Sequence, residues 1–185
     1  NYEKDEKKIV GGKNGYGAKL TNIFSQYFKL ETLDSVRGLR YVQVFKDNMK
    51  NRGKPNVIKS DNKSYTKISW IPDFKRFGLE GYSDKMYQLM ERRIYDIAGV
   101  TDKKVNVIYN KKTIKQKSFD KYIDLYLQGE KVVYEDIHER WSLGIAVSTT
   151  DKFEQISFVN GIATPKGGKH VDYITNLLVK ALTTH

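Results

Sequence analysis

Cysteine is absent from this 185-residue chain, and histidine occurs only three times, at widely separated positions. Without cysteine the chain can form no disulfide, no thiolate nucleophile and no cysteine-ligated zinc site. The scattered His138, His170 and His185 also argue against a metal site built on imidazoles. No apolar run is long enough for a transmembrane helix, so no membrane association is expected, and the charged N-terminal residues do not resemble a signal peptide.

Acidic residues are few relative to basic ones, with 22 Asp and Glu against 33 Lys and Arg and a formal net charge of +11. Such a surplus favours polyanionic partners, namely nucleotide phosphates, DNA or RNA. The lysines are spread along the chain, however, so a solvated lysine-rich surface explains the charge as well. The 39% hydrophobic content suffices for a real core and excludes wholesale disorder.

Hydrophobic periodicity predicts a mixture of helices and strands. The predicted helices cover residues 20–27, 84–98, 119–126 and 172–182. The predicted strands cover residues 28–32, 41–45, 65–71, 105–109, 113–117, 132–136, 141–148 and 155–159. Residues 46–62 are polar and contain Gly53 and Pro55, which predicts a connecting loop, and Gly99 is expected to end the second helix. Mixed elements with short antiparallel links predict an α+β chain, with a domain boundary near Gly129.

The stretch GGKNGYGAKL, residues 11–20, places four glycines directly before a predicted helix. A helix start offers free N–H groups and the positive end of the helix dipole. Glycines let the backbone fold closely around an anion, and Lys13 and Lys19 add charge. A β-branched side chain at Gly17 is expected to block close phosphate approach and any positive φ that the turn needs. The stretch therefore describes a phosphate cradle, with a structural turn as the alternative; it is neither a Walker A motif nor a dinucleotide fingerprint.

Longer motifs add a specific resemblance. NYEKDEKKIVGGKNGYGAKLTNIFS resembles the nucleotide-binding segment of eukaryotic-type DNA topoisomerase II, and QISFVNGIATPKGGKHVDYI resembles the transducer region of that family. YTKISWIPDFKRFG, MERRIYDIAG and SFDKYIDLYL lie between them in the family's order. The resemblance covers essentially the whole chain and identifies it as a piece of the ATPase gate of a type IIA topoisomerase.

The resemblance implies a two-part architecture. Residues 1–128 are similar to the latter part of a GHKL (Bergerat) ATPase domain, an α/β sandwich, including its phosphate loop. Residues 129–185 resemble the first part of a transducer domain with a ribosomal-protein-S5-like fold. The resemblance further implies ATP and Mg²⁺ as ligands, double-stranded DNA as a partner, a homodimer in the full enzyme and a nuclear location.

The resemblance also assigns ATP binding to particular positions. The matched residues are Asn1, Gly12, Lys13, Asn14, Gly15, Tyr16, Gly17, Ala18 and Lys19. Backbone N–H groups of the loop would hold the β- and γ-phosphates, and Lys19 would supply a point charge. Asn14 would fix the loop or donate to phosphate, while Tyr16 would contact nucleotide or pack the lid. Lys13 stands where relatives usually carry arginine. The positive charge is kept, but lysine cannot form the two parallel hydrogen bonds that a guanidinium group donates to phosphate.

The resemblance places the remaining catalytic parts outside this chain. The general-base glutamate, the magnesium-holding asparagine and an adenine-contacting aspartate are expected upstream of Asn1, and the switch lysine beyond His185. No catalytic residue and no metal ligand is therefore assigned here, and the chain alone is expected not to hydrolyse ATP.

Several alternatives stay open. Gly167 and Gly168 also precede a predicted helix, with Lys166 and Lys169 beside them. They form a second anion site or, as the transducer resemblance favours, shape a loop. For the chain as a whole, the alternatives are another GHKL-family ATPase and a non-catalytic basic nucleic-acid-binding module.

Overall fold

The computed structural model describes residues 11–12, 14–127 and 129–184. Its contacts divide the chain into two compact units. One unit comprises residues 12–83, and the other comprises residues 84–184 together with Gly11. Among the described residues, no helix combines the length and the apolar content that crossing a bilayer requires.

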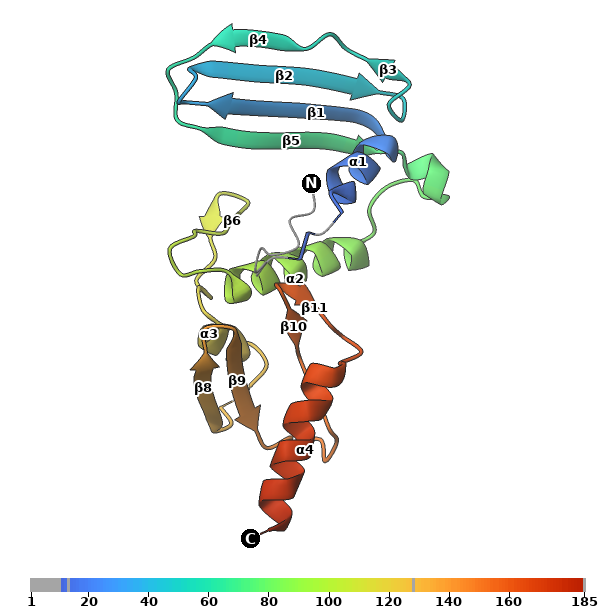
Figure 1. Ribbon diagram of the computed structural model, residues 1–185. Helices are drawn as coiled ribbons and strands as arrows, with labels where there is room; N and C mark the ends of the chain where they lie inside the picture. Colours follow the sequence, from blue (N-terminus) through green and yellow to red (C-terminus); the bar gives the residue numbers. More distant parts are fainter. Residues whose placement is uncertain (1–10, 13, 128, 185) are drawn as a thin grey trace. The chain divides into compact units, whose positions relative to one another are not determined.

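The unit of residues 12–83 is a five-stranded antiparallel sheet preceded by a short helix, α1 (Tyr16–Ile23). Its strands are β1 (Ser25–Asp34), β2 (Leu39–Lys46), β3 (Asn51–Arg52), β4 (Asn56–Lys59) and β5 (Tyr65–Pro72). β1 pairs with β2 on one side and β5 on the other, while β3 and β4 both pair with β2 (Figure 1). A 3₁₀ turn, Phe74–Phe77, follows β5.

Large apolar side chains gather on one face of this sheet, because successive side chains along each strand point to opposite faces. Phe28 on β1 lies opposite Phe45 on β2 and Trp70 on β5, and its side chain is buried. The Phe28 and Phe45 rings meet edge to face, with centroids 6.2 Å apart. A cross-strand aromatic pair of this kind stabilises the sheet and favours the observed register of β1 against β2.

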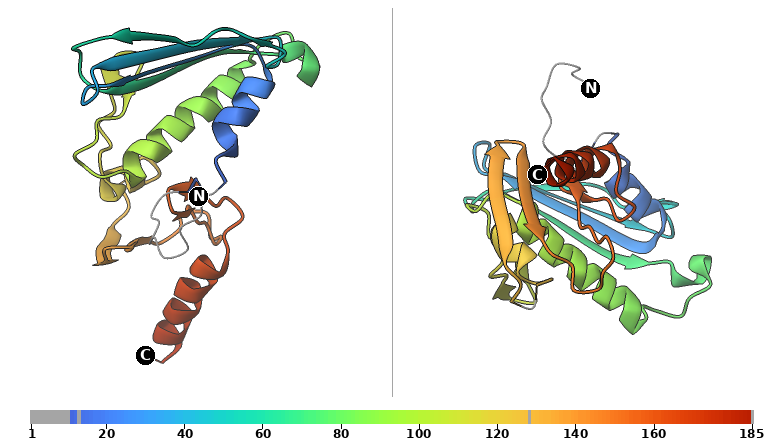
Figure 2. Two further views of the ribbon diagram at one scale, coloured as in Figure 1. Left: turned by 45° about the horizontal axis from the view of Figure 1, so that its top comes forward. Right: turned by 90° about the horizontal axis from the view of Figure 1, so that it is seen from below.

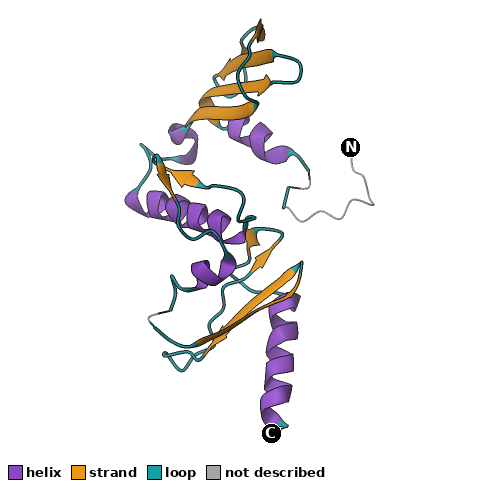
Figure 3. Ribbon diagram, turned by 90° about the vertical axis from the view of Figure 1, so that its left-hand side faces the viewer, coloured by secondary structure: helices purple, strands orange, loops and turns teal. Residues whose placement is uncertain are grey.

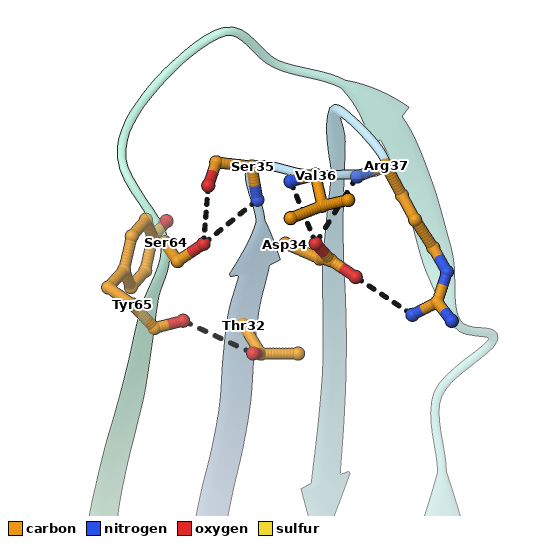
Figure 4. Close-up of polar contacts among 7 residues, drawn as sticks. All are labelled: Thr32, Asp34, Ser35, Val36, Arg37, Ser64 and Tyr65. Carbon is orange, nitrogen blue, oxygen red and sulfur yellow. Dashed lines mark hydrogen bonds and ion pairs between the residues drawn. The ribbon is translucent and has the colours of Figure 1, made fainter.

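The tip of the β1–β2 hairpin is held by Asp34, as Figure 4 shows. Its carboxylate accepts hydrogen bonds from the N–H groups of Arg37 and Val36, and the Arg37 guanidinium lies 2.8 Å from its second oxygen. The Arg37 N–H, the Val36 N–H and the guanidinium together hold the pKa of Asp34 below its usual range. The Ser64 hydroxyl accepts from the Ser35 N–H at 2.9 Å and ties this turn to the start of β5.

The unit of residues 84–184 combines helices with two-stranded ribbons (Figure 3). Its helices are α2 (Asp84–Val100), α3 (Phe119–Ile123) and α4 (Lys169–Thr183). Its ribbons pair β6 (Ile108–Tyr109) with β7 (Lys112–Thr113), β8 (Val132–His138) with β9 (Trp141–Ala146), and β10 (Phe158–Val159) with β11 (Ile162–Ala163). The longest ribbon is β8–β9 (Figure 2), and α3 packs against both α2 and β9.

Tyr122 of α3 is the centre of this unit, with 1% of its surface exposed. Its hydroxyl donates to the buried Asp96 carboxylate at 2.6 Å and lies 2.7 Å from the Tyr126 hydroxyl. Burial, followed by these hydrogen bonds, raises the pKa of Tyr122. The Phe119 and Phe158 rings lie 6.2 and 5.6 Å from the Tyr122 ring, which joins β10 to the same cluster.

Arg93 of α2 connects this cluster to the β10–β11 turn. One guanidinium nitrogen donates to the Gly161 carbonyl oxygen at 2.8 Å, and another lies 3.8 Å from the Asp96 carboxylate. Residues on both sides of the boundary predicted near Gly129 therefore pack in one contact unit. The assignment of residues 1–128 and 129–185 to separate domain families stays a prediction.

The structure confirms the α+β class and corrects several boundaries. α1 covers residues 16–23, so it begins earlier than predicted, and the predicted helical residues 25–27 belong to β1. Residues 51–52 and 56–59, predicted as loop, are strands because β2 offers them an edge to pair with. Gly99 does not end the helix, since α2 continues to Val100. The hairpin at 105–117 exists but has shorter strands.

Gly99 instead permits a close approach between α2 and α3. A Cβ atom at this position would lie 2.6 Å from Cβ and Cγ of Tyr122, which are not free to move away. Substituting alanine for glycine inside a helix ordinarily gains about 1 kcal/mol. Here we expect the opposite sign, with Gly99→Ala lowering the free energy of unfolding by roughly 1–3 kcal/mol through overpacking.

Urea denaturation would measure this effect, with Gly81→Ala as the matched control. A Cβ at Gly81 meets no atom within 4 Å, so that variant should lie within about 0.5 kcal/mol of the unmodified chain. A Gly99→Ala chain as stable as the control would contradict the close approach.

Candidate phosphate-binding site

The first turn of α1 follows a glycine in the left-handed backbone conformation. Gly15, at the N-cap, has φ 66° and ψ 17°, a conformation that favours glycine over residues with a Cβ. The N–H groups of the first helical turn have no intrahelical acceptor, and the helix dipole adds partial positive charge there. No Asp or Glu occupies this turn, so no carboxylate of α1 competes for an incoming anion.

The surface in front of these N–H groups is open. A Cβ placed on Gly12, Gly15 or Gly17 meets no atom within 4 Å. Asn14, Ala18 and Lys19 are exposed, and 58% of the Tyr16 surface is exposed. The site is therefore a solvent-accessible helix start with room for a ligand against the backbone.

The positive φ of this turn is at Gly15, and Gly17 has none. Gly17 is the second residue of α1 and has a helical neighbour on each side. The other expectation for Gly17, that a side chain there would obstruct phosphate, stays a prediction. The open space around its Cβ position is compatible with it.

The far end of α1 is firmly anchored, which gives the exposed start a rigid support. The Ser25 hydroxyl donates to the Thr21 carbonyl oxygen at 2.5 Å, and the Asn48 side-chain amide donates to the Ile23 carbonyl oxygen at 2.9 Å. Asn22 is buried. These contacts satisfy carbonyl groups that a helix end leaves without partners. A binding group on a supported helix keeps its geometry better than one on a free loop.

Seven of the nine predicted ATP-binding residues lie in α1 or just before it and are described by the structure: Gly12, Asn14, Gly15, Tyr16, Gly17, Ala18 and Lys19. Asn1 and Lys13 lie outside the described residues. The segment is local in sequence, so the structure brings together what the motif already placed together. It adds the conformation of Gly15 and the accessibility of the helix start.

Gly11, next to the predicted site, has a packing role. A Cβ there would lie 2.3 Å from Cδ1 of Ile162 on β11 and 3.3 Å from the Asn160 carbonyl oxygen. The first glycine of the motif thus belongs to the contacts of the β10–β11 ribbon. Sequence reasoning treated the four glycines as one feature, and only the fold distinguishes them.

Gly167 and Gly168 have positive φ values of 70° and 149° and lead into α4. The preceding turn is held internally, because the Gln155 side-chain amide donates to the Pro165 carbonyl oxygen at 3.1 Å and Nε2 of His170 lies 3.2 Å from the Thr164 hydroxyl. These contacts favour the loop-shaping interpretation. Gln155 and His170 both form hydrogen bonds within this loop.

Metal-binding side chains do not gather in the part of the chain that the structure describes. Within residues 11–12, 14–127 and 129–184, no three or more of His, Asp and Glu stand close enough to hold an ion.

Comparisons with known proteins identify the family to which the chain is similar. A family model described as DNA gyrase B matches residues 101–185. DNA topoisomerase 2 of Acanthamoeba polyphaga mimivirus is 44% identical over 190 residues, covering 100% of this chain and 15% of that protein. DNA topoisomerase 2 of Saccharomyces cerevisiae is 42% identical over 203 residues, covering 99% of this chain and 14% of that protein.

Solved structures give the same result. The ATPase region of S. cerevisiae topoisomerase II has a TM-score of 0.92 and 45% identity, over 100% of this chain and 49% of that one. The ATPase and transducer domains of DNA topoisomerase II from Balamuthia mandrillaris have a TM-score of 0.92 and 37% identity, over 100% of this chain and 48% of that one.

The fold and these matches define part of the ATPase region of a type II DNA topoisomerase. The chain spans about 15% of the length of its curated relatives and about half of the solved ATPase-region chains. Within that class, the chain belongs to the eukaryotic-type DNA topoisomerase II family.

Proposed function

We propose that this chain supplies the phosphate-binding loop and the first part of the transducer in the ATP-operated gate of a type IIA DNA topoisomerase. One observation carries the proposal: α1 begins at an exposed, glycine-headed turn with free N–H groups and no acidic side chain in its first turn. A helix start of this kind binds phosphate groups through its backbone and its dipole.

In this proposal the residues divide the binding between backbone and side chain. The N–H groups of residues 15–18 donate to the β- and γ-phosphate oxygens. Lys19 is the fourth residue of α1, and side chains on a helix lean toward its N-terminus, so its ammonium group can reach back to the same phosphates. Asn14 and Tyr16 contact the nucleotide or hold the loop around it, and Asn1 and Lys13 add polar contacts.

The proposed domain assignment follows the family. Residues 1–128 belong to the GHKL (Bergerat) ATPase sandwich, and residues 129–185 to the transducer with its ribosomal-protein-like fold. The hydrogen bond from Arg93 to the Gly161 carbonyl oxygen supports direct packing of the first part on the second. ATP binding makes two such gates form a homodimer around one DNA duplex, which then passes through a transient double-strand break. In a eukaryotic cell this activity is nuclear.

Magnesium and water activation are proposed to come from the portion of the ATPase region that this chain does not cover. When bound, Mg²⁺ neutralises charge on the phosphates during transfer. The described residues contribute N–H donors and the Lys19 ammonium group, which orient and bind the phosphates. They include no group assigned as the base that activates water.

We therefore expect the 185-residue chain alone to release no phosphate from ATP above background. A chimaeric ATPase region, in which this chain replaces the matching segment of the S. cerevisiae ATPase region, should hydrolyse ATP. The measurement is phosphate release from ATP and Mg²⁺ by both proteins at equal concentration. Turnover by the isolated chain at the rate of the chimaera would contradict the assignment of base and metal ligand to the other segment.

A further inference from the structure

The β6–β7 hairpin and its flanks carry an unusual density of positive charge. Residues 103–118 contain six lysines and no Asp or Glu. Lys111 lies in the turn, Lys112 is in β7, and Lys115 follows it; all three are exposed. Among the residues that the structure describes, no carboxylate forms an ion pair with these three side chains. Their charge is thus available to a partner.

The turn holds a lysine where glycine is preferred. Asn110 and Lys111 have φ values of 48° and 66°, and Tyr109 pairs with Lys112 across them, so the turn has two residues with positive φ. The β10–β11 ribbon has the same arrangement, but its turn is Asn160 and Gly161, with φ values of 50° and 75°. Lysine is strained in this conformation and glycine is not. The β6–β7 turn therefore keeps a charge at its tip at a conformational cost.

The base of the hairpin is fixed, so the tip projects from a defined support. Ile114 is buried and its N–H donates to the Val107 carbonyl oxygen at 2.9 Å. Lys117 donates through Nζ to the Asn106 side-chain oxygen at 2.5 Å, which joins the two flanks. Beyond this base, 61% of the Ile108 surface is exposed. A two-stranded ribbon with an open, basic tip results.

We propose that the tip of this hairpin, Lys111, Lys112 and Lys115, is a contact site for the phosphate backbone of duplex DNA. The inference rests on the proposed function for the presence of DNA and adds where the chain touches it. The major groove of B-form DNA admits a two-stranded ribbon, with phosphates on both sides of it. The major groove of A-form RNA is too narrow for such a ribbon, which favours DNA as the partner.

The test measures binding of the 185-residue chain to a fluorescent 20-base-pair duplex, without nucleotide, as salt is raised from 50 to 200 mM. Each lost phosphate contact reduces the magnitude of the slope of log affinity against log salt by about 0.9. The triple variant Lys111→Gln, Lys112→Gln, Lys115→Gln should lose about 2.7 from this slope and bind at least roughly tenfold more weakly at 100 mM salt.

The matched control removes three exposed lysines of the other unit, as Lys54→Gln, Lys59→Gln, Lys63→Gln. It carries the same net charge as the triple variant but should keep nearly all of the slope. Equal losses in the two triple variants would overturn the proposal, because binding would then depend on net charge alone. Failure of the unmodified chain to bind DNA at 50 mM salt, or tighter binding to an RNA duplex of the same length, would also overturn it.

Lys111→Gly separates the DNA contact from a structural role. Glycine adopts the positive φ without strain, so this variant should have a higher melting temperature. The magnitude of the slope of log affinity against log salt should fall by about 0.9. A variant that is stabilised and binds DNA with an unchanged slope would contradict the assignment of Lys111. Because nucleotide is absent throughout, loss of ATP binding at Lys19 leaves these results unaffected, and the two proposals fail independently.

Discussion

Lys19→Ala in the chimaeric ATPase region is expected to weaken ATP binding by roughly 10- to 150-fold. Lys19 lies in the first turn of α1, whose N–H groups are proposed to bind the same phosphates. A hydrogen bond to a charged group contributes about 1.5–3 kcal/mol, which corresponds to that range of affinity. Titration calorimetry with a non-hydrolysable ATP analogue measures the loss directly.

The matched control is Lys50→Ala, which removes an exposed lysine from the same unit, between β2 and β3. It should leave nucleotide affinity unchanged within error, because a solvated lysine elsewhere contributes only weak screened attraction. Equal nucleotide affinity in the Lys19→Ala protein and the unmodified protein would remove Lys19 from the site. Lys19→Arg should retain part of the affinity, since the charge survives with different geometry.

Tyr122→Ala is expected to destabilise the unit of residues 84–184 by about 3–5 kcal/mol. Truncating a fully buried aromatic side chain leaves a cavity, and the Tyr122 ring contacts both Phe119 and Phe158. The variant also leaves the buried Asp96 carboxylate without its 2.6 Å donor. Tyr122→Phe isolates that second effect and should cost roughly 1–3 kcal/mol.

The two tryptophans allow this measurement to be made on one unit at a time. Trp70 lies on β5 and Trp141 on β9, so a Trp70→Phe background leaves Trp141 to report the unit that contains Tyr122. Phe153→Ala is the control, because 70% of the Phe153 surface is exposed and its loss should cost within about 0.5 kcal/mol. A midpoint for Tyr122→Ala that equals the control's would contradict the central packing role of Tyr122.

Strong local patterns made much of the fold predictable. The alternation in residues 65–71, followed by Pro72, predicted β5 within one residue, and the helical spacing after Ser83 predicted where α2 begins. β4 was not predictable in the same way, because Val57 and Ile58 stand alone among polar residues. Pairing with β2, a contact distant in sequence, makes this segment a strand. Gly99 shows the same limit, since its closest neighbour, Tyr122, is far along the chain.

The candidate site was predictable to a different degree. Four glycines before a helix indicate an anion site, and the longer motif indicated which family uses it. Nothing in the sequence alone distinguishes Gly11, which packs against Ile162, from Gly15, which supplies the left-handed turn. The six lysines of residues 103–118 stand close together in the sequence, but the pairing of residues 109 and 112 is what places Lys111 in an exposed turn.

The most direct test of the central claim follows backbone amides during titration with ATP. In the chimaeric ATPase region labelled at glycine with nitrogen-15, we expect saturable shifts of the Gly15 and Gly17 amide resonances, with Gly167 and Gly168 nearly unchanged. Donation of the Gly15 and Gly17 N–H groups to phosphate oxygens is the physical cause. Saturation of nucleotide binding with the Gly15 and Gly17 resonances unmoved, or with the largest shifts at Gly167 and Gly168, would contradict the account.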